Sequence, residues 1–316
     1  MVNPARSRAR EAQDLLSADL ERAGWSRAFV LPTTVAEPGG PQARAALDHG
    51  ADLVVVIGGD GTLRQVAHEL VGHDAALGIV PVGTANLFAR NLLLAPRPLA
   101  ESVRIALHGD RARVDAGLAT ITTRHGSHRA TFLVLAGIGH DALTVQRVPE
   151  VFKRHLGWLG YFGPAALTVR RRPTRMMVRL DDADPMVLEA WSVLAVNCGR
   201  IPGGVRITRG SLADDGLLET LVVTASSARQ WAGIAVKGLL DLPYDVPGLQ
   251  QDAARRLRVL PDHAQPMQLD GDVERAVTAV DFEIRPAALT VVVPPREGRG
   301  VTTQNSPVAG SRSVTQ

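Results

Sequence analysis

The sequence predicts an N-terminal α/β unit, built as a doubly wound, Rossmann-like sheet, joined to a C-terminal antiparallel β-sandwich. In the first third of the chain, runs of Val, Ile and Leu alternate with segments whose apolar residues recur at helical spacing. Beyond Asp115, short strands separated by Gly and Asp turns dominate, as in antiparallel sandwiches. At 316 residues the chain has room for two domains. We expect them at residues 1–117 and 118–293, before a disordered polar tail at 294–316.

Hydrophobic periodicity and turn residues place the individual elements. The first strand ends at Asn3-Pro4 and is so short that we expect residues to be missing before Met1. The N-terminal unit then shows patterns for helices over 8–23, 43–49, 63–72 and 87–93, and for strands over 29–31, 54–57 and 77–82. The C-terminal unit shows patterns for strands over 131–136, 176–180, 192–196, 217–223, 257–260, 280–284 and 289–293, and for helices over 142–156, 158–170 and 228–240.

Composition excludes several classes of protein. The 35 basic and 32 acidic residues leave a net charge of only +3, and 4% of residues are aromatic, so nothing favours nucleic-acid binding. The single cysteine, Cys198, excludes an internal disulfide and indicates a reducing compartment. Arginine supplies nearly all the positive charge, because Lys153 and Lys237 are the only lysines. A phosphate loop built on a lysine near residue 60 is therefore excluded.

The chain shows no pattern that would place it inside a membrane. Met1 leads into polar, arginine-rich sequence, which is unlike a signal peptide. No apolar run approaches the ~20 residues that a spanning helix requires. We expect a cytoplasmic protein whose contact with the inner membrane face, if any, is peripheral.

The most informative stretch follows the buried strand at 54–57. It is a turn with three glycines in four positions, after which helical periodicity begins, and this geometry aims backbone N–H groups at a phosphate. A carboxylate in such a turn would repel bare phosphates, so Asp60 suggests an intervening Mg²⁺; the alternative is a tight turn with Asp60 as a local cap. Thr62 can cap the helix or contact the phosphate. The turn consists of Gly58, Gly59, Asp60, Gly61 and Thr62.

A second glycine turn, at residues 83–86, follows the next strand and should lie at the same sheet edge. With the first turn it resembles the diacylglycerol kinase catalytic-domain family, which includes bacterial soluble lipid kinases and sphingosine kinases. The resemblance covers nearly everything up to Pro294. Its further motifs are Asn3-Pro4, residues 137–142 (GIGHDA), residues 214–218 (DDGLL) and residues 269–272 (LDGD). The first turn alone is also shared with NAD kinases and phosphofructokinases.

The resemblance implies an ATP-dependent lipid kinase, most simply one that converts diacylglycerol to phosphatidic acid in phospholipid biosynthesis. ATP and Mg²⁺ would lie in a cleft between the two units. Besides the first turn, the implied nucleotide contacts are Thr34, Gly83, Thr84 and Asp115. For Asp115 the alternative is a solvated residue at the domain junction.

The general base implied by the resemblance is Asp272. The family has a glutamate at this position, in an Asp-Gly-Glu triplet, so the carboxylate here is one methylene shorter. The alternative is a plain hairpin turn in which Asp272 is an exposed neighbour. Leu87 also departs from the family, which often has an aspartate there.

A structural Mg²⁺ is implied at Asp215, with the carbonyl groups of Leu212 and Leu217 completing its site; the alternative is a turn formed by Asp214-Asp215-Gly216. For the lipid, the aromatic and apolar residues 155–162 precede the arginines at 170–172, a combination that suits an anionic membrane surface or else a helix packed on its own domain. A pseudokinase and a soluble-substrate kinase related to NAD kinase remain alternative functions. A homodimer is left open.

Overall fold

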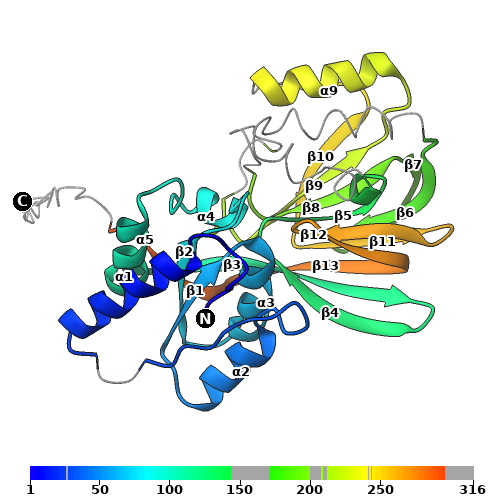
Figure 1. The fold of residues 1–316 in the computed structure, drawn as a ribbon. Helices are drawn as coiled ribbons and strands as arrows, with labels where there is room; N and C mark the ends of the chain where they lie inside the picture. The colour runs from blue at the N-terminus through cyan, green and yellow to red at the C-terminus, as the bar shows by residue number, and fades with distance from the viewer. Residues whose placement is uncertain are drawn as a thin grey trace, which may run out of the picture.

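The structure is a computed structural model that describes residues 1–25, 28–143, 171–199, 208, 212–240, 242 and 244–295. Figure 1 shows a helix-covered unit at the N-terminal end and a strand-rich unit beside it. In the described part of the chain, the strands join into one 13-stranded sheet that runs through both units.

Two short parallel strands form the centre of the N-terminal unit. Strand β1 (Leu53–Gly58) pairs in parallel with β2 (Ala76–Pro81) along its whole length. On the far side of β1, Val2 makes parallel bridges with Ile57 and Pro32. Because the pairs run in parallel, the carboxyl ends of these strands lie together at one edge, where an α/β sheet binds ligands.

Helices cover both faces of this sheet (Figure 1). On one face, α1 (Ala9–Arg22) and α5 (Leu99–His108) pack on a core that includes Ile57 and Val80. On the other, α2 (Gly40–Asp48) and α3 (Asp60–Leu70) pack on a core that includes Val54 and Val56. The short α4 (Leu87–Asn91) follows β2. Because helices cover both faces, every residue of β1 is buried or half-buried, which accounts for the near-continuous apolar run in the sequence.

The C-terminal unit is antiparallel, and its strands enclose a second core in which Phe132 and Phe282 meet edge to face at 5.9 Å. The continuous strand order is β10-β9-β8-β5-β12-β13-β11-β6-β7, with β3 and β4 attached beside β13. Helix α9 (Ala228–Leu240) packs outside, against Trp191. The strands are β3 (Asp110–Thr123), β4 (Gly126–Phe132), β5 (Leu135–Gly139), β6 (Thr174–Leu180), β7 (Met186–Ala190), β8 (Ser192–Val196), β9 (Leu218–Val223), β10 (Leu249–Ala254), β11 (Arg256–Pro261), β12 (Gln265–Leu269) and β13 (Asp272–Val293).

The 22-residue strand β13 belongs to both units. Its first half pairs with β12 and β11 in the sandwich, while Thr290 and Val291 pair in parallel with β2 in the helix-covered unit. Strand β3 accompanies it antiparallel from Val293 back to Val277, so two strands cross between the units side by side.

Several sequence predictions differ from the structure. Residues 29–31 form no strand, and Phe29 is 74% exposed, because only the Pro32 bridge joins this edge to the sheet. The strand predicted at 131–136 is broken between β4 and β5, where backbone N–H groups turn to the Asp270 carboxylate. The two strands predicted at 280–284 and 289–293 are one, since a β-bulge between Arg285 and Leu289 lets β13 continue. Helix α9 has the predicted bounds.

Most of the two helices predicted between 142 and 170, and the tail from Arg296 onward, lie outside the described residues. Cys198 is buried, as its apolar neighbours predicted. Across the described portion of the chain, the helices are too short or too polar to cross a bilayer.

Candidate active site

The first glycine turn joins β1 to α3. Gly59 has extended backbone angles and is the residue before the first turn of α3. No side chain caps the N-terminus of this helix. The first N–H groups of an α-helix have no intrahelical acceptor, so they point outward at the end of β1. Thr62 is not the helix cap, because it lies inside the first turn of α3, where its buried Oγ1 accepts a hydrogen bond from Asn3 Nδ2 at 3.2 Å. The turn therefore presents backbone donors at the sheet edge.

The two glycine turns touch, as their places at the ends of adjacent parallel strands predicted. A Cβ atom built on Gly83 would lie 2.6 Å from the Cα atom of Gly59. Asn86 holds the second turn by accepting a hydrogen bond from the Gly83 N–H and donating one to its carbonyl oxygen. Thr84, between them, is exposed. The close approach depends on the absence of side chains at both glycines.

Asp60 connects the first turn to α4. Its Oδ1 accepts a hydrogen bond of 2.7 Å from the Leu87 N–H, so it caps the neighbouring helix rather than its own. Burial raises the pKa of Asp60, while backbone hydrogen bonds from Leu87, Phe88 and Asn86 oppose that rise. A desolvated carboxylate at this place favours a proton or a cation beside it.

An arginine that the sequence analysis did not single out lies over the first turn. The Nη2 atom of Arg6 is 3.6 Å from the position of a Cβ built on Gly59. Its Nε atom is buried and meets no hydrogen-bond acceptor within the described residues. The sequence signal was available, since Arg6 follows Asn3-Pro4 closely and lysines are absent from this region. A guanidinium group in this position can neutralise a phosphate.

Asp272 reaches the same turn from the opposite end of the sequence. It is the first residue of β13, after the Asp270-Gly271 turn of the β12–β13 hairpin, and its Oδ2 lies 3.9 Å from the position of a Cβ built on Gly61. That oxygen also accepts a hydrogen bond of 2.7 Å from Arg64 Nη2, which belongs to α3. The β12–β13 hairpin is present, as the alternative interpretation expected, but Asp272 beside it faces the first glycine turn.

Two polar side chains, the half-buried Asp270 and the buried Gln268, hold the hairpin turn in place. Asp270 accepts hydrogen bonds from the N–H groups of residues 133, 134 and 135 at 2.7–3.0 Å. Burial raises its pKa to about 6, against the effect of those three donors and of Arg64. Gln268 accepts a hydrogen bond from the Gly271 N–H at 3.0 Å and donates one to Asp141 at 3.3 Å. The backbone that carries Asp272 is therefore fixed by the sandwich.

Asp115 is a buried structural residue rather than a solvated one, with 2% of its surface exposed. Its Oδ2 accepts a hydrogen bond from the Gly216 N–H at 2.6 Å, and its Oδ1 accepts one from the Ala287 N–H at 2.7 Å. It thus ties the loop at 213–216 to the bulge of β13, where Ala287 has a φ of 49°. Both carboxylate oxygens are engaged in holding the junction of the two units.

Asp215 closes the neighbouring loop. Its Oδ2 accepts a hydrogen bond from the Leu212 N–H and its Oδ1 accepts one from the Leu217 N–H, both at 2.9 Å. Leu212 and Leu217 thus approach this carboxylate through their N–H groups. The side chain is exposed, so water can reach it.

The predicted residues therefore fall into separate groups. The first group surrounds the glycine turns and contains Gly58, Gly59, Asp60, Gly61, Thr62, Gly83 and Asp272. The second, around Asp115 and Asp215, lies at the junction of the units. Thr34 belongs to neither in its observed bonding, because it closes an exposed turn by accepting a hydrogen bond from the Glu37 N–H at 3.0 Å.

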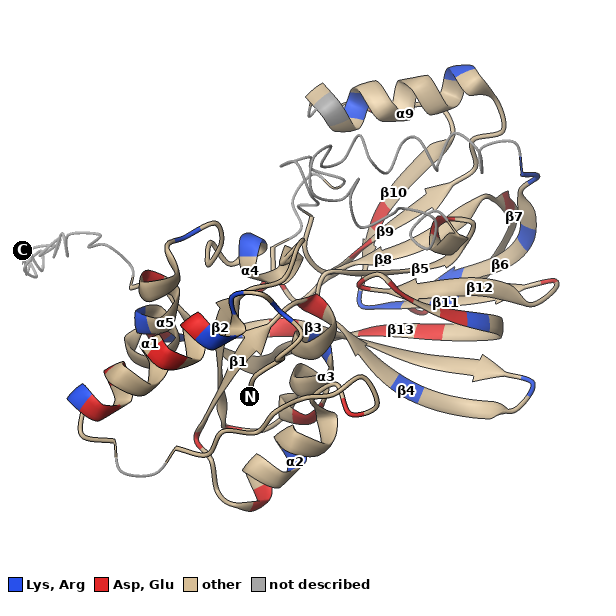
Figure 2. Ribbon diagram, viewed as in Figure 1, with Lys and Arg blue, Asp and Glu red and all other residues tan. Residues whose placement is uncertain are grey.

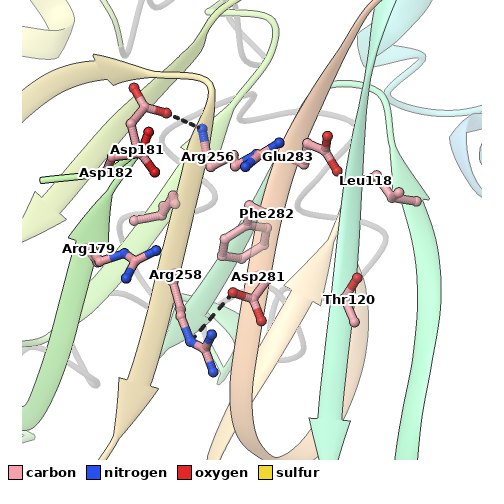
Figure 3. Close-up of a pocket in the computed structure, with 11 residues that line it drawn as sticks. Leu118, Thr120, Arg179, Asp181, Asp182, Arg256, Arg258, Asp281, Phe282 and Glu283 are labelled. Carbon is pink, nitrogen blue, oxygen red and sulfur yellow. Dashed lines mark hydrogen bonds and ion pairs between the residues drawn. The ribbon is translucent and has the colours of Figure 1, made fainter. Parts of the chain in front are cut away.

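A pocket of about 120 Å³ lies elsewhere, on the outside of the sandwich (Figure 3). Basic side chains of β6 and β11 and acidic side chains of β13 line it (Figure 3), and one ion pair joins Arg258 to Asp281 at 3.6 Å. In Figure 2 the ribbons of this part of the sheet carry both acidic and basic positions. None of its lining residues belongs to the glycine turns or to the hairpin turn that carries Asp272. The opposing charges compensate one another, so we do not assign this pocket to the reaction.

Known families match both units. Residues 1–119 match the model of the diacylglycerol kinase catalytic domain, and residues 134–293 match that of the YegS C-terminal NAD kinase beta sandwich-like domain. The chain belongs to the YegS-like lipid kinase family. Among its relatives, a "Probable lipid kinase YegS-like" of Chromohalobacter salexigens is 30% identical over 235 residues, which cover 73% of this chain and 72% of the relative. One of Klebsiella pneumoniae is 28% identical over 258 residues, which cover 79% and 80%.

Solved structures share the fold of this lipid kinase family member. The crystal structure of a diacylglycerol kinase from Bacillus anthracis str. Sterne superimposes with a TM-score of 0.67 at 18% identity, over 92% of this chain and 94% of that chain. A second crystal structure from the same organism gives a TM-score of 0.71 at 20% identity, over 92% and 95%.

Kinases of this kind typically use a divalent metal, and Asp60 has the chemistry to hold Mg²⁺. One carboxylate suffices, because nucleotide phosphates and water supply the other ligands of this ion. Within the described residues, no three acidic, His or Cys side chains gather to form a closed metal site. Asp215 offers carboxylate oxygens that accept two N–H bonds, so Mg²⁺ binding there stays a prediction.

Proposed function

We propose that this enzyme transfers the γ-phosphoryl group of ATP to a lipid hydroxyl group, most simply that of diacylglycerol, which yields phosphatidic acid. One observation carries the proposal. The carboxylate of Asp272, from the end of the sandwich hairpin, lies against Gly61 in the turn that presents backbone donors at the N-terminus of α3. A proton acceptor and a phosphate-binding turn thus meet at the boundary between residues 1–117 and 118–293.

The nucleotide half of the site is built from the two turns. Backbone N–H groups at the start of α3 and the glycines at 59, 61 and 83 allow phosphate oxygens to approach closely. Arg6 adds a positive charge above Gly59 and replaces the absent lysine in neutralising the triphosphate. Asp60 would hold Mg²⁺, whose charge would neutralise the negative charge that develops on the phosphate oxygens.

Asp272 would serve the acceptor. The lipid hydroxyl oxygen forms a bond to the γ-phosphorus, the bond from that phosphorus to the bridging oxygen of ADP breaks, and the hydroxyl proton passes to the carboxylate. Positioning and charge neutralisation supply most of the acceleration in such reactions, so a base that is one methylene short can still act if the site holds it in place. We propose that the lipid approaches from the inner membrane face, with residues 118–293 forming its side of the site. The apolar segment at 155–162 lies outside the described residues.

Phosphate transfer from labelled ATP to extracted lipids tests the proposal. Purified protein, Mg²⁺ and γ-labelled ATP are incubated with vesicles of total membrane lipid, and the products are separated into organic and aqueous phases. Label in phosphatidic acid is the expected result. Label in another lipid would correct the substrate, and label in a soluble product would indicate a relative of NAD kinase. Nucleotide binding without any labelled product would identify a pseudokinase.

A further inference from the structure

Arg64 is a buried charge at the boundary between α3 and the sandwich hairpin. Its side chain is 9% exposed, and within the described residues its ion pair is with Asp272, at 2.7 Å. Its Nη1 points to the Thr131 carbonyl oxygen at 3.4 Å, while Nε has no hydrogen-bond acceptor in that part of the chain. Because removing a guanidinium group from water is costly, the ion pair with Asp272 stabilises this arginine, and the nearby Asp270 carboxylate adds a second favourable charge. The ion pair between Arg64 and Asp272 connects α3 to β13 of the sandwich.

The pair fixes one oxygen of Asp272. Arg64 holds Oδ2, whereas the side chain as a whole is 60% exposed. Among the described residues, Asp272 accepts its side-chain hydrogen bond from Arg64. A carboxylate that serves as a base needs one oxygen for the substrate and gains from having the other held, because orientation lowers the entropic part of the barrier.

The backbone of the turn is fixed independently, by Asp270 and Gln268. The remaining freedom of Asp272 is therefore rotation of its short side chain, and Arg64 removes this freedom. The direction in which it holds the carboxylate is toward the first turn of α3, next to Gly61.

We infer that Arg64 is a positioning residue that holds the short carboxylate of Asp272 against the glycine turn. The inference rests on the proposed role of Asp272 as the base. This role explains how Asp272 can act at the position where the family has a glutamate, whose longer side chain would reach further toward the substrate. The interaction also makes the base geometry depend on contact between α3 and the hairpin, because each residue belongs to a different unit.

A double-mutant cycle tests this. Arg64→Gln, Asp272→Asn and the double variant are purified, and kcat, KM for ATP and the urea midpoint of unfolding are measured. We expect Arg64→Gln to lower kcat roughly 10- to 100-fold, the effect of misplacing a reacting group by about 1 Å, with KM for ATP nearly unchanged. In the Asp272→Asn background the same change should leave kcat unaltered. Arg64→Lys should recover part of the lost kcat. Arg44→Gln is the matched control, since its ion pair with Glu69 also reaches α3 but is solvent-facing.

Stability separates positioning from a merely structural role. Asp272→Asn removes the ion-pair partner of the buried Arg64 charge, so its urea midpoint should fall, and the double variant should regain stability without regaining kcat. If Arg64→Gln keeps wild-type kcat while Asp272→Asn loses activity, the inference about Arg64 is wrong and the base assignment stands. Additive losses would also overturn the inference. If Asp272→Asn is itself fully active, the base assignment fails, and the role of Arg64 fails with it.

Discussion

Gly59 and Gly83 lie in contact, although 23 residues and a complete helix separate them in the sequence. A Cβ on Gly83 would approach both the Gly59 Cα atom and the Asn86 Oδ1 atom to 2.6 Å, closer than nonbonded carbon and oxygen atoms can pack. A Cβ on Gly59 would meet Gly83 at 3.2 Å. The two turns therefore form one surface only because neither Gly59 nor Gly83 carries a side chain.

Gly59→Ala should weaken ATP binding. The new methyl group would separate the turns and stand between the phosphates and the backbone donors, so we expect the Kd for ATP to rise roughly tenfold, equivalent to about 1.4 kcal/mol. Isothermal titration with ATP measures this. Gly233→Ala in α9 is the matched control, because a Cβ there meets nothing within 4 Å. Equal ATP affinity in both variants would remove this turn from the nucleotide site.

Arg6→Gln should reduce affinity for the triphosphate but not for the nucleoside. A charge-assisted hydrogen bond contributes about 1.5–3 kcal/mol, so the Kd for ATP should rise by roughly 10- to 100-fold, with little change for adenosine. The loss should shrink at high salt. Arg8→Gln is the control, since Arg8 pairs with Glu11 in solvent. If the two variants bind ATP equally well, Arg6 makes no phosphate contact.

Asp272→Asn should lower kcat by roughly 10²–10⁴-fold, the usual contribution of a positioned base, while ATP binding stays nearly unchanged. Asp272→Glu should retain far more activity, because it keeps a carboxylate that Arg64 can hold. Steady-state lipid phosphorylation by both variants gives the comparison. Asn suits a hairpin as well as Asp does, so an Asn variant within a few-fold of wild type would mean that the position serves only the turn.

Mg²⁺ should raise the melting temperature in the absence of nucleotide if Asp215 binds it, since a ligand of the native state stabilises that state by mass action. Asp215→Ala should abolish this response, and it should also lower the melting temperature without metal, because Leu212 and Leu217 lose their acceptor. Scanning calorimetry across a Mg²⁺ series separates the two effects. A variant that is less stable but responds fully to Mg²⁺ would limit Asp215 to closing the loop.

Asp141 should make the protein less stable as pH rises from about 4 to about 6. Burial raises its pKa from 3.8 to about 6, while hydrogen bonds from Ser192 and Gln268 oppose this. Within that interval the folded state keeps a proton that the unfolded chain has released, so unfolding becomes easier with increasing pH. The whole shift corresponds to at most about 3 kcal/mol, at 1.36 kcal/mol per pKa unit.

Urea midpoints at several pH values check this dependence. Asp141→Asn should show a smaller decrease across the interval than wild type, because the amide does not ionise. The comparison between variants is needed because burial lowers the pKa of His140, which acts in the opposite direction. Asp182→Asn, an exposed aspartate, is the control. Identical pH profiles for wild type and Asp141→Asn would show that Asp141 is ionised in the native state throughout the interval.

The sequence predicted most of the fold because apolar periodicity and glycine turns report on local structure. It predicted β1, α3 and α9 well, and it predicted that the two glycine turns share an edge. It did not predict that β13 is continuous, because a bulge resembles a turn when only neighbouring residues are considered. It missed Arg6 and Arg64 for a related reason: a basic residue near a motif is common, and only tertiary contacts show which acidic group or glycine it faces.

Because β13 and β3 pass through both units, the boundary between the two matched segments is not a place where the chain can be divided. A fragment ending at residue 119 would lack the Thr290–Val291 partner of β2, leaving an unpaired sheet edge open to aggregation. A fragment beginning at residue 134 would keep β13 but lose β3, its longest partner. The kinase is therefore expected to unfold as one cooperative body, and a premature stop near residue 270 would remove β13 and so disrupt the α/β unit as well as the sandwich.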